Sequence, residues 1–303
     1  MRIASLCQLL LALVLAPLLP GVINKVKAFV AGRTGPPIVQ LYHDMFKLLG
    51  KGAVYSETTT SVFRFAPLAG LAAVIVALTL LPIGSVRALL AFPGDLVLLA
   101  YLLGLMRFLT VIGALDTGSS FEGMGASREV QFSALAEPVL MLTMVALARQ
   151  ADNLSLSGIY PAITGNTWVQ AGPALAMISA ALLAVSLAEN ARIPVDDPNT
   201  HLELTMIHEV MVLDFSGPDL AFIHYAAALK LWVFGSLLVG LCLPLRTGQA
   251  LADVGAFLAG MFLFATVIGI IESTMARLRL LRVPQMLVGA GAIAIVALVL
   301  VLR

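Results

Sequence analysis

Long apolar runs are the feature that most constrains how this chain can fold. The hydrocarbon core of a bilayer is roughly 30 Å thick, so a helix that crosses it needs about 20 apolar residues. Eight segments reach or nearly reach that length, at residues 3–23, 65–83, 95–115, 132–151, 172–189, 219–244, 251–272 and 284–302. Because lipid offers no partners to backbone polar groups, such segments must be helical. We expect an all-α integral membrane protein with eight transmembrane helices in a single membrane domain, residues 1–303.

The composition indicates the same class of protein. Hydrophobic residues make up 60% of the 303 and charged residues 12%, whereas soluble domains carry about 25% charged residues. The net charge of +1 provides no basic excess for phosphate neutralisation, so nucleic acid is not an expected partner. Cys7 and Cys242 stand far apart in apolar runs without a CxxC or Cys/His spacing. We therefore expect neither an iron–sulfur cluster nor a metal site in this chain.

The distribution of Lys and Arg predicts the orientation in the membrane. Eleven basic residues fall in the first, third, fifth and seventh loops, and five fall on the other side. Cytoplasmic loops carry the excess, so we expect a multi-pass protein of the inner (plasma) membrane with both termini outside. The polar cytoplasmic loops then lie at about residues 24–64, 116–131, 190–218 and 273–283. The first apolar run lacks a small-residue cleavage pattern, which favours a retained span over a signal peptide.

The first loop contains a Gly/Pro turn followed by interleaved apolar and polar residues, at 32–52. This pattern predicts a short amphipathic helix that lies along the lipid headgroups. Two interpretations remain open. The helix is either a simple surface anchor or part of a docking surface, for which Arg33, Asp44 and Lys47 supply fixed charges.

The third loop reads DTGSSFEGMGASRE at residues 116–129. No Lys follows its glycines, so the segment is not a P-loop and nucleotide binding is not expected. We expect a close-packed turn against neighbouring protein, with the next helix beginning near Ser127, Arg128 and Glu129.

The candidates among the charged residues inside the predicted spans are Arg107, Glu137, Glu189, Lys230 and Glu272. A charge at the bilayer centre costs at least about 2.5 kcal/mol, and such residues usually face the bundle interior or a water path. Pro138 frees a backbone carbonyl beside Glu137 that can host water. The spacing of Glu189 and Arg192 predicts an ion pair on one helix face. Arg107, Glu189 and Glu272 fall near the cytoplasmic ends of their predicted spans, where snorkelling to the interface or a helix cap is the alternative to a role in proton exchange.

The fifth loop holds a polar segment, PVDDPNTHLELTMIHEVMVLD, at residues 194–214. Its two prolines exclude a regular helix at the start, and cap residues predict a helix from near Thr200. Too few apolar residues follow to cross a bilayer, so we expect a polar, half-inserted helix. Its HxExxxxHE spacing differs from HExxH and offers no third ligand, so zinc is not expected. The segment is either a solvated cytoplasmic face or a partner-covered lining that exchanges protons.

Several stretches together resemble one family. These are Arg33, Gly35, Pro36, Gln40, Asp44, Lys47, Leu48, LDTGSSF (115–121), GASRE (125–129), Glu137, Pro138, Glu189, Pro194, Asp196, Ser216, Gly217 and SxMARLRL (273–280). The chain resembles the membrane-anchor subunit of group 4 membrane-bound NiFe hydrogenases, of the formate hydrogenlyase and hydrogenase-4 type. That membrane anchor is homologous to NuoH of respiratory complex I.

The resemblance implies a non-redox subunit of an oxidoreductase complex, not catalytic on its own. It implies docking of a hydrogenase-like large subunit and a small Fe–S subunit, on the cytoplasmic side, to antiporter-like membrane subunits in the lipid bilayer. The NiFe centre and Fe–S clusters would belong to those partners, and electron transfer would be coupled to proton or sodium translocation.

The same resemblance and the polar residues of the chain together give two sets of candidate site residues. The proton-relay candidates are Glu137, Glu189, Asp196, His201, Glu203, His208, Glu209 and Lys230. The candidates for docking the peripheral arm are Arg33, Asp44, Lys47, Arg128, Glu129, Arg277 and Arg279.

The fifth loop departs from the family pattern. Val195 stands where a Phe is usual, and Asn199 and His201 stand where acids are expected. His201 can carry a proton near neutral pH, whereas Asn199 cannot. Alternatives to the hydrogenase subunit are the NuoH-type quinone-site subunit of an NADH:quinone oxidoreductase, a purely structural membrane anchor and an independent secondary transporter.

Overall fold

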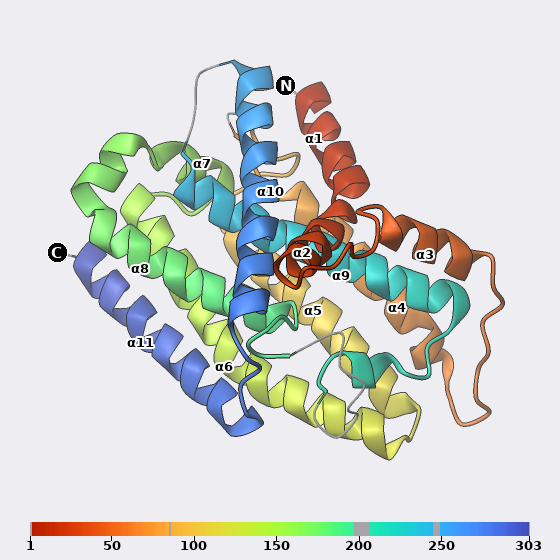
Figure 1. Cartoon of the computed structure of the whole chain (residues 1–303). Coiled ribbons are helices and arrows are strands. Elements are labelled where there is room, and N and C mark those ends of the chain that lie inside the picture. Colours follow the sequence, from red (N-terminus) through yellow and green to blue (C-terminus); the bar gives the residue numbers. More distant parts are fainter. Residues whose placement is uncertain (1, 85, 197–205, 245–248, 303) are drawn as a thin grey trace.

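The computed structural model describes residues 2–84, 86–196, 206–244 and 249–302, and this part of the chain is helical without strands (Figure 1). Among the described residues, seven helices are long and apolar enough to cross a membrane. They are α4 (Ser61–Thr79), α5 (Asp95–Asp116), α6 (Ser120–Ala151), α8 (Gly165–Glu189), α9 (Gly217–Cys242), α10 (Ala250–Thr274) and α11 (Val283–Val301), the last with the preceding 3-10 turn η2 (Leu280–Arg282). The prediction of an all-α, multi-pass membrane protein is confirmed.

An eighth span is formed only if α1 (Arg2–Leu15) and α2 (Leu18–Val30) are counted together, since they are bent by 43° at their junction. Pro17 explains the break, because it lacks the N–H that would donate to the carbonyl of Leu13. The hydroxyl of Tyr225 donates to that carbonyl at 2.9 Å, and the hydroxyl of Tyr42 donates to the carbonyl of Val14. The freed backbone acceptors are therefore satisfied by side chains from α9 and α3.

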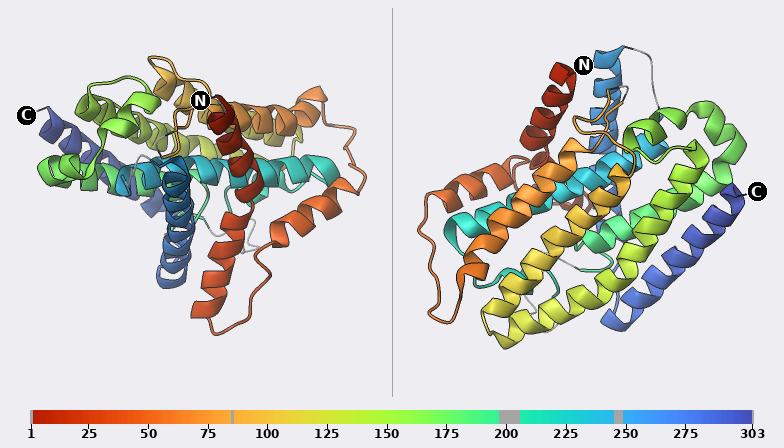
Figure 2. Two further views of the ribbon diagram at one scale, coloured as in Figure 1. Left: turned by 90° about the horizontal axis from the view of Figure 1, so that it is seen from above. Right: turned by 180° about the vertical axis from the view of Figure 1, so that it is seen from behind.

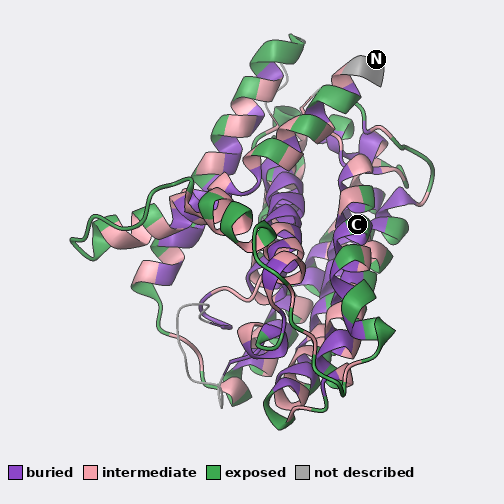
Figure 3. Cartoon of the chain, turned by 90° about the vertical axis from the view of Figure 1, so that its right-hand side faces the viewer, coloured by how far each residue is buried: buried purple, intermediate pink, exposed green. Residues whose placement is uncertain are grey.

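Helix α9 lies at the centre of the bundle. Almost all of its second half is buried, including the large side chains of Trp232 and Phe234. It contacts α4, α3, α10 and α8, and the buried residues follow the inner faces of the helices (Figure 3). Helices α2 and α10 pack on each other and project together from the layer of the other helices (Figure 2). A polar side chain on α9 is thus held inside protein rather than in lipid.

The amphipathic helix predicted within residues 32–52 is present as α3 (Gln40–Leu49). It packs against α9 and has no fully buried residue. Leu41 faces the interior, while Phe46 is 73% exposed. The helix therefore covers the bundle from outside, as an interfacial helix does.

The predicted loop at 116–131 is mostly wrong, because α6 begins at Ser120 and leaves only residues 117–119 outside a helix. The glycines that indicated a loop allow close packing instead. A Cβ added at Gly125 would lie 2.4 Å from Cγ1 of Val210 and 2.9 Å from the carbonyl of Ile207. The close-packed contact that we predicted here exists, but it joins helix α6 to the fifth loop of the same chain.

The half-inserted helix predicted in the fifth loop is not observed in the described residues. From residue 206 onward, the chain forms only a 3-10 turn, η1 (Glu209–Val212), before α9 begins. Met211 and Val212 are buried with Phe63 and Phe215 in a separate apolar cluster, so these residues pack inward instead of forming a lipid-facing stripe. The start of the predicted helix, 200–205, lies outside the described residues.

A short additional helix, α7 (Leu156–Ala162), follows α6 and was not predicted. The buried carboxylate of Asp95 caps it, accepting from the backbone N–H of Leu156 at 2.7 Å and from the hydroxyl of Ser155 at 2.6 Å. Helix α8 begins at Gly165, earlier than the predicted span, with non-helical torsion angles at Ala171 two residues before Pro173.

Candidate functional site

The candidate site is built around Arg107 in the middle of α5. Its Nη1 lies 2.5 Å from Oε1 of Glu137, and its Nη2 lies 2.5 Å from Oε1 of Glu189. Its Nε lies 3.4 Å from Oε1 of Glu129. The side chains of Arg107 and Glu189 are 7% and 3% exposed, whereas that of Glu137 is 50% exposed. One guanidinium therefore joins three carboxylates from α6 and from the C-terminal end of α8, and we call this set the Arg107 cluster.

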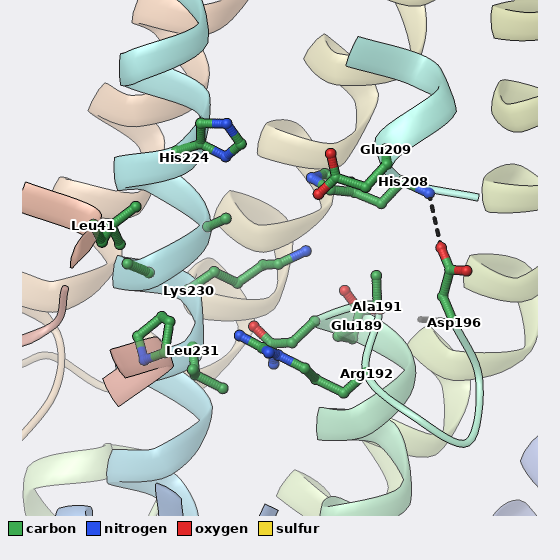
Figure 4. A pocket seen from close by; sticks show the side chains of 14 residues that line it. Leu41, Glu189, Ala191, Arg192, Asp196, His208, Glu209, His224, Lys230 and Leu231 are labelled. Atoms are coloured by element: carbon green, nitrogen blue, oxygen red, sulfur yellow. Dashed lines mark hydrogen bonds between the residues drawn. The ribbon is translucent and has the colours of Figure 1, made fainter. Parts of the chain in front are cut away.

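Lys230 of α9 lies next to the Arg107 cluster and is 6% exposed. Its ammonium makes no hydrogen bond or ion pair with any residue in the described part of the chain, although Glu189 and Glu129 are close enough to act on it electrostatically. Figure 4 shows its side chain extending between His208 and Glu209 on one side and Glu189 and Arg192 on the other.

Lys230 and Glu189 line a cavity of about 140 Å³ between α8, α9 and the fifth loop. Leu41 of α3 and Pro20 of α2 contribute its apolar wall, so the amphipathic helix closes one side of it. Burial is the main cause that lowers the pKa of His208, another lining residue, to about 3, and the nearby Lys230 and His224 act in the same direction. The His208 imidazole is therefore neutral at pH 7.

The fifth loop is fixed by Asp196, which is 1% exposed. Its carboxylate accepts from the backbone N–H groups of Ile207 at 3.0 Å and His208 at 3.2 Å. Arg277 of the seventh loop pairs with the same carboxylate at 2.8 Å. The backbone N–H of Leu278 also donates to the carbonyl of Pro194 at 2.8 Å. The fifth and seventh loops are therefore joined directly beside the cavity.

The predicted pair of Glu189 with Arg192 is not formed. The chain leaves α8 at Ala191, where φ is +48°, and this turn directs Arg192 away from the helix face that carries Glu189. Arg192 instead lies 3.4 Å from Glu272 of α10, which also pairs with Lys27 of α2 at 2.7 Å. The two ion pairs at Glu272 connect α2, α10 and the fifth loop.

Helix α6 holds the other end of the fifth loop. Arg128 donates from Nη1 to the carbonyl of Met206 at 2.8 Å. Glu122, which is fully buried, accepts from the backbone N–H of Asp214 at 3.1 Å. Together with the close contact at Gly125, these hydrogen bonds hold the fifth loop between α6 and the cavity.

One protein family covers almost the whole chain. The model of the family described as NADH dehydrogenase matches residues 3–302. The chain belongs to this family. It is also 32% identical over 292 residues to formate hydrogenlyase subunit 4 of Escherichia coli K12, covering 92% of each chain. It is 33% identical over 290 residues to hydrogenase-4 component C of the same organism, covering 93% of this chain and 90% of that one.

The fold of this NADH dehydrogenase family member is also found in a solved structure. A chain of the membrane-bound sulfane sulfur reductase, an archaeal respiratory membrane complex, superposes with a TM-score of 0.84 at 20% identity. The match covers 99% of this chain and 98% of that chain. The family resemblance inferred from the sequence motifs is thus confirmed, and the helical arrangement is one that occurs in a respiratory complex.

The predicted relay residues fall into two groups in this family member. Those around the Arg107 cluster and its cavity are Glu137, Glu189, Asp196, His208, Glu209 and Lys230. His201 and Glu203 lie outside the described residues, as do Asp197 and Asn199. Arg107 itself was recognised only as a span charge and was left out of the relay set. Its position, twelve residues into α5, is too deep for snorkelling, and this depth was the available signal.

The predicted docking residues are divided between the surface and the interior. Arg33, Lys47 and Arg279 are exposed. Asp44, half-buried, accepts from Gln40 within α3. The other three, namely Arg128, Glu129 and Arg277, make the internal contacts described above. Among the described residues there is no group of three or more His, Cys, Asp or Glu side chains placed to hold a metal ion.

Proposed function

We propose that this chain is the membrane subunit of a complex-I-like, hydrogenase-type complex, in which it couples electron transfer in a peripheral arm to proton or sodium translocation. The peripheral arm would comprise a large subunit with a NiFe centre and a small Fe–S subunit on the cytoplasmic side. Antiporter-like membrane subunits would complete the membrane arm. The proposal is supported by the relatives, which are subunits of formate hydrogenlyase and hydrogenase-4.

The observation that carries the coupling role is the Arg107 cluster inside the helical bundle. Removing two opposite charges from water costs more than their attraction returns unless the geometry is very good, so a buried ion pair is weak evidence for stability. Charged residues inside spans are expensive and mark ion paths when they face the interior. Here one guanidinium, three carboxylates and Lys230 come from four different helices, and Glu189 and Lys230 of this set line the cavity.

The connections of the fifth loop give this cluster a mechanical link to the protein surface. Asp196 and Arg277 join the fifth and seventh loops, and Glu272 joins α2 and α10 to Arg192. Glu189 and Arg192 are three residues apart at the end of α8. A peripheral arm that presses on these loops can therefore shift Glu189 relative to Arg107, which changes the electrostatic environment of the cluster.

The test is Glu189→Gln in the complete complex, measured in inverted membrane vesicles. We expect ion uptake to be lost while subunit assembly and electron transfer from an artificial donor are retained. Glu57→Gln, at an exposed acid of the first loop, is the matched control and should pump normally. Unchanged ion uptake in the Glu189→Gln complex would exclude the coupling role and leave a structural anchor.

The partner assignment is tested separately by native purification and identification of the co-purifying subunits. A large subunit with paired CxxC motifs and bound nickel is expected in the same particle. Replacing the exposed Arg33 and Arg279 together by Gln should weaken retention of that arm on the membrane. A particle that lacks a nickel-binding partner would overturn the hydrogenase assignment but not the membrane fold.

A quinone-site subunit of an NADH:quinone oxidoreductase is the second candidate, because the matching family is described as NADH dehydrogenase. The cavity beside Lys230 gives it no support. Its volume of about 140 Å³ is below the roughly 300–1,000 Å³ of pockets that hold organic ligands of drug size. Inhibition of the complex by quinone-site ligands would favour this second candidate.

A further inference from the structure

The cavity beside the Arg107 cluster brings together polar atoms that have no hydrogen-bond partner among the described residues. Glu189 binds Arg107 through Oε1, but its buried Oε2 accepts no hydrogen bond from the described residues. Asn190 donates its side-chain amide to the carbonyl of Ser186 at 2.8 Å, and its buried Oδ1 has no donor in the same part of the chain. The ammonium of Lys230 brings three donors to the same cavity. Within the described part of the chain, two acceptors and one donor group without a hydrogen-bond partner therefore line the same cavity.

The size and lining of the cavity fit water. A single water needs roughly 10–15 Å³ of space for its centre and two to four polar partners. About 140 Å³ holds several such molecules, and Lys230, Glu189 and Asn190 supply the partners. Water hydrogen-bonded between these groups can satisfy the polar atoms of Glu189, Asn190 and Lys230 without moving a helix.

The charge on Lys230 is not explained by stability. A buried charge is costly to desolvate, and Lys230 has no ion-pair partner among the described residues that would repay this cost. A Met at position 230 would fill the site beside Leu229 and Leu231, which are almost fully buried, and would leave no unpaired donor. A buried lysine at this position therefore indicates a functional role for its proton.

We propose that water in this cavity carries a proton between Nζ of Lys230 and Oε2 of Glu189, so that Lys230 loads protons into the Arg107 cluster. This inference rests on the proposed coupling function. It assigns Lys230 as the site from which protons enter the Arg107 cluster. In the forward step an N–H bond of the Lys230 ammonium breaks and an O–H bond forms on Glu189, with water passing the proton between them. The reverse step restores both groups, so no other reactant is consumed.

Electrostatics couples the two groups. When Lys230 gives up its proton, the positive charge that stabilised the Glu189 carboxylate disappears at the same moment that the carboxylate is neutralised. Arg107 then keeps Glu129 and Glu137 as its charged partners. Among the described residues, the titratable and charged groups that face Lys230 are Arg107 on α5, Glu129 on α6, Glu189 on α8, Arg192, Asp196, His208 and Glu209 in the fifth loop, and His224 on α9.

The experiment compares Lys230→Met with Lys230→Arg in the complete complex, using ion uptake by inverted vesicles and electron transfer as separate readouts. Arg keeps the positive charge but is not deprotonated in proteins. We expect both variants to assemble, to transfer electrons and to lose ion uptake. Lys51→Met and Lys51→Arg, at an exposed lysine of the first loop, are the matched controls and should pump normally.

Two outcomes would overturn the inference. Ion uptake retained by Lys230→Arg would show that only a fixed charge is needed, and uptake retained by Lys230→Met would show that no proton is needed there. If Glu189→Gln abolishes uptake while a Lys230 variant pumps, the proposed function stands and this inference fails. If Glu189→Gln and Lys230→Met both pump, both fail. Asn190→Ala, which removes an acceptor for water together with the donor to the Ser186 carbonyl, should slow uptake, and an unchanged rate would contradict the water path.

Discussion

Removing the guanidinium of Arg107 should destabilise the protein far more than removing any one of its partners. In Arg107→Met, Glu189 and Glu129 lose their ion pair while their side chains are 3% and 13% exposed. Leaving a buried charge uncompensated costs about 3–5 kcal/mol. Glu137 adds little, because its side chain is half exposed and water screens it. The expected loss is a large share of a total stability of about 5–15 kcal/mol.

The loss can be assigned to the cluster by a double-mutant cycle. Glu189→Gln alone should cost less, because Arg107 keeps two carboxylates. Adding Glu189→Gln to Arg107→Met removes one uncompensated charge, so the double variant should be more stable than the sum of the two single effects by about 1–3 kcal/mol.

Unfolding by SDS titration in mixed micelles measures these energies through the fluorescence of the two tryptophans, of which Trp232 is buried. A loss below about 1 kcal/mol for Arg107→Met, the range of exposed ion pairs, would refute the reasoning. So would strict additivity in the cycle. Either result would mean that water reaches the carboxylates in the folded protein.

Three further predictions concern packing, backbone bonding and pH. Gly125→Val should cost about 1–3 kcal/mol, since its side chain collides with Val210, and it should expose the fifth loop to protease. Tyr225→Phe should cost about 1 kcal/mol in SDS unfolding, because the carbonyl of Leu13 loses its donor. Because burial lowers the pKa of His208 to about 3, unfolded chains bind a proton there below about pH 6.5 that folded chains do not. Wild-type stability should therefore fall from about pH 6.5 toward about pH 4, and His208→Gln should reduce that fall.

Matched substitutions separate these effects from general damage. Gly123 lies in the same helix with nothing within 4 Å of an added Cβ, so Gly123→Val should be tolerated. Tyr101 is 69% exposed, and Tyr101→Phe should leave SDS unfolding unchanged. His43 is exposed on α3, and His43→Gln should keep the full pH dependence. Equal losses in a variant and its control would contradict the corresponding prediction.

The sequence alone was sufficient for the membrane fold, because the bilayer imposes one length and one secondary structure on every span. Seven of the predicted spans coincide with helices that are long enough to cross a membrane. The amphipathic helix α3 was predicted from the periodicity of its apolar residues. The start of α6 was missed because glycine favours both loops and close helix contacts, and only the position of the fifth loop decides between them.

The chemistry of the site was predictable only in part. The span charges identified Glu189 and Lys230, since their insertion cost demands an explanation. Their partners were not predictable, because Arg107 meets carboxylates that lie 22, 30 and 82 residues along the chain from it. Local spacing instead predicted Glu189 with Arg192, and that pair is replaced by a contact with α10 once the chain turns at Ala191.

The break at Pro17 has a mechanical consequence for the membrane. The two hydroxyls that satisfy the carbonyls at this break come from α3, which walls the cavity, and from α9, which carries Lys230. A thinner bilayer makes a helix tilt, and tilting α1 pulls on both of these tyrosines at once. We expect the volume of the cavity beside Lys230 to depend on the acyl-chain length of the surrounding lipid.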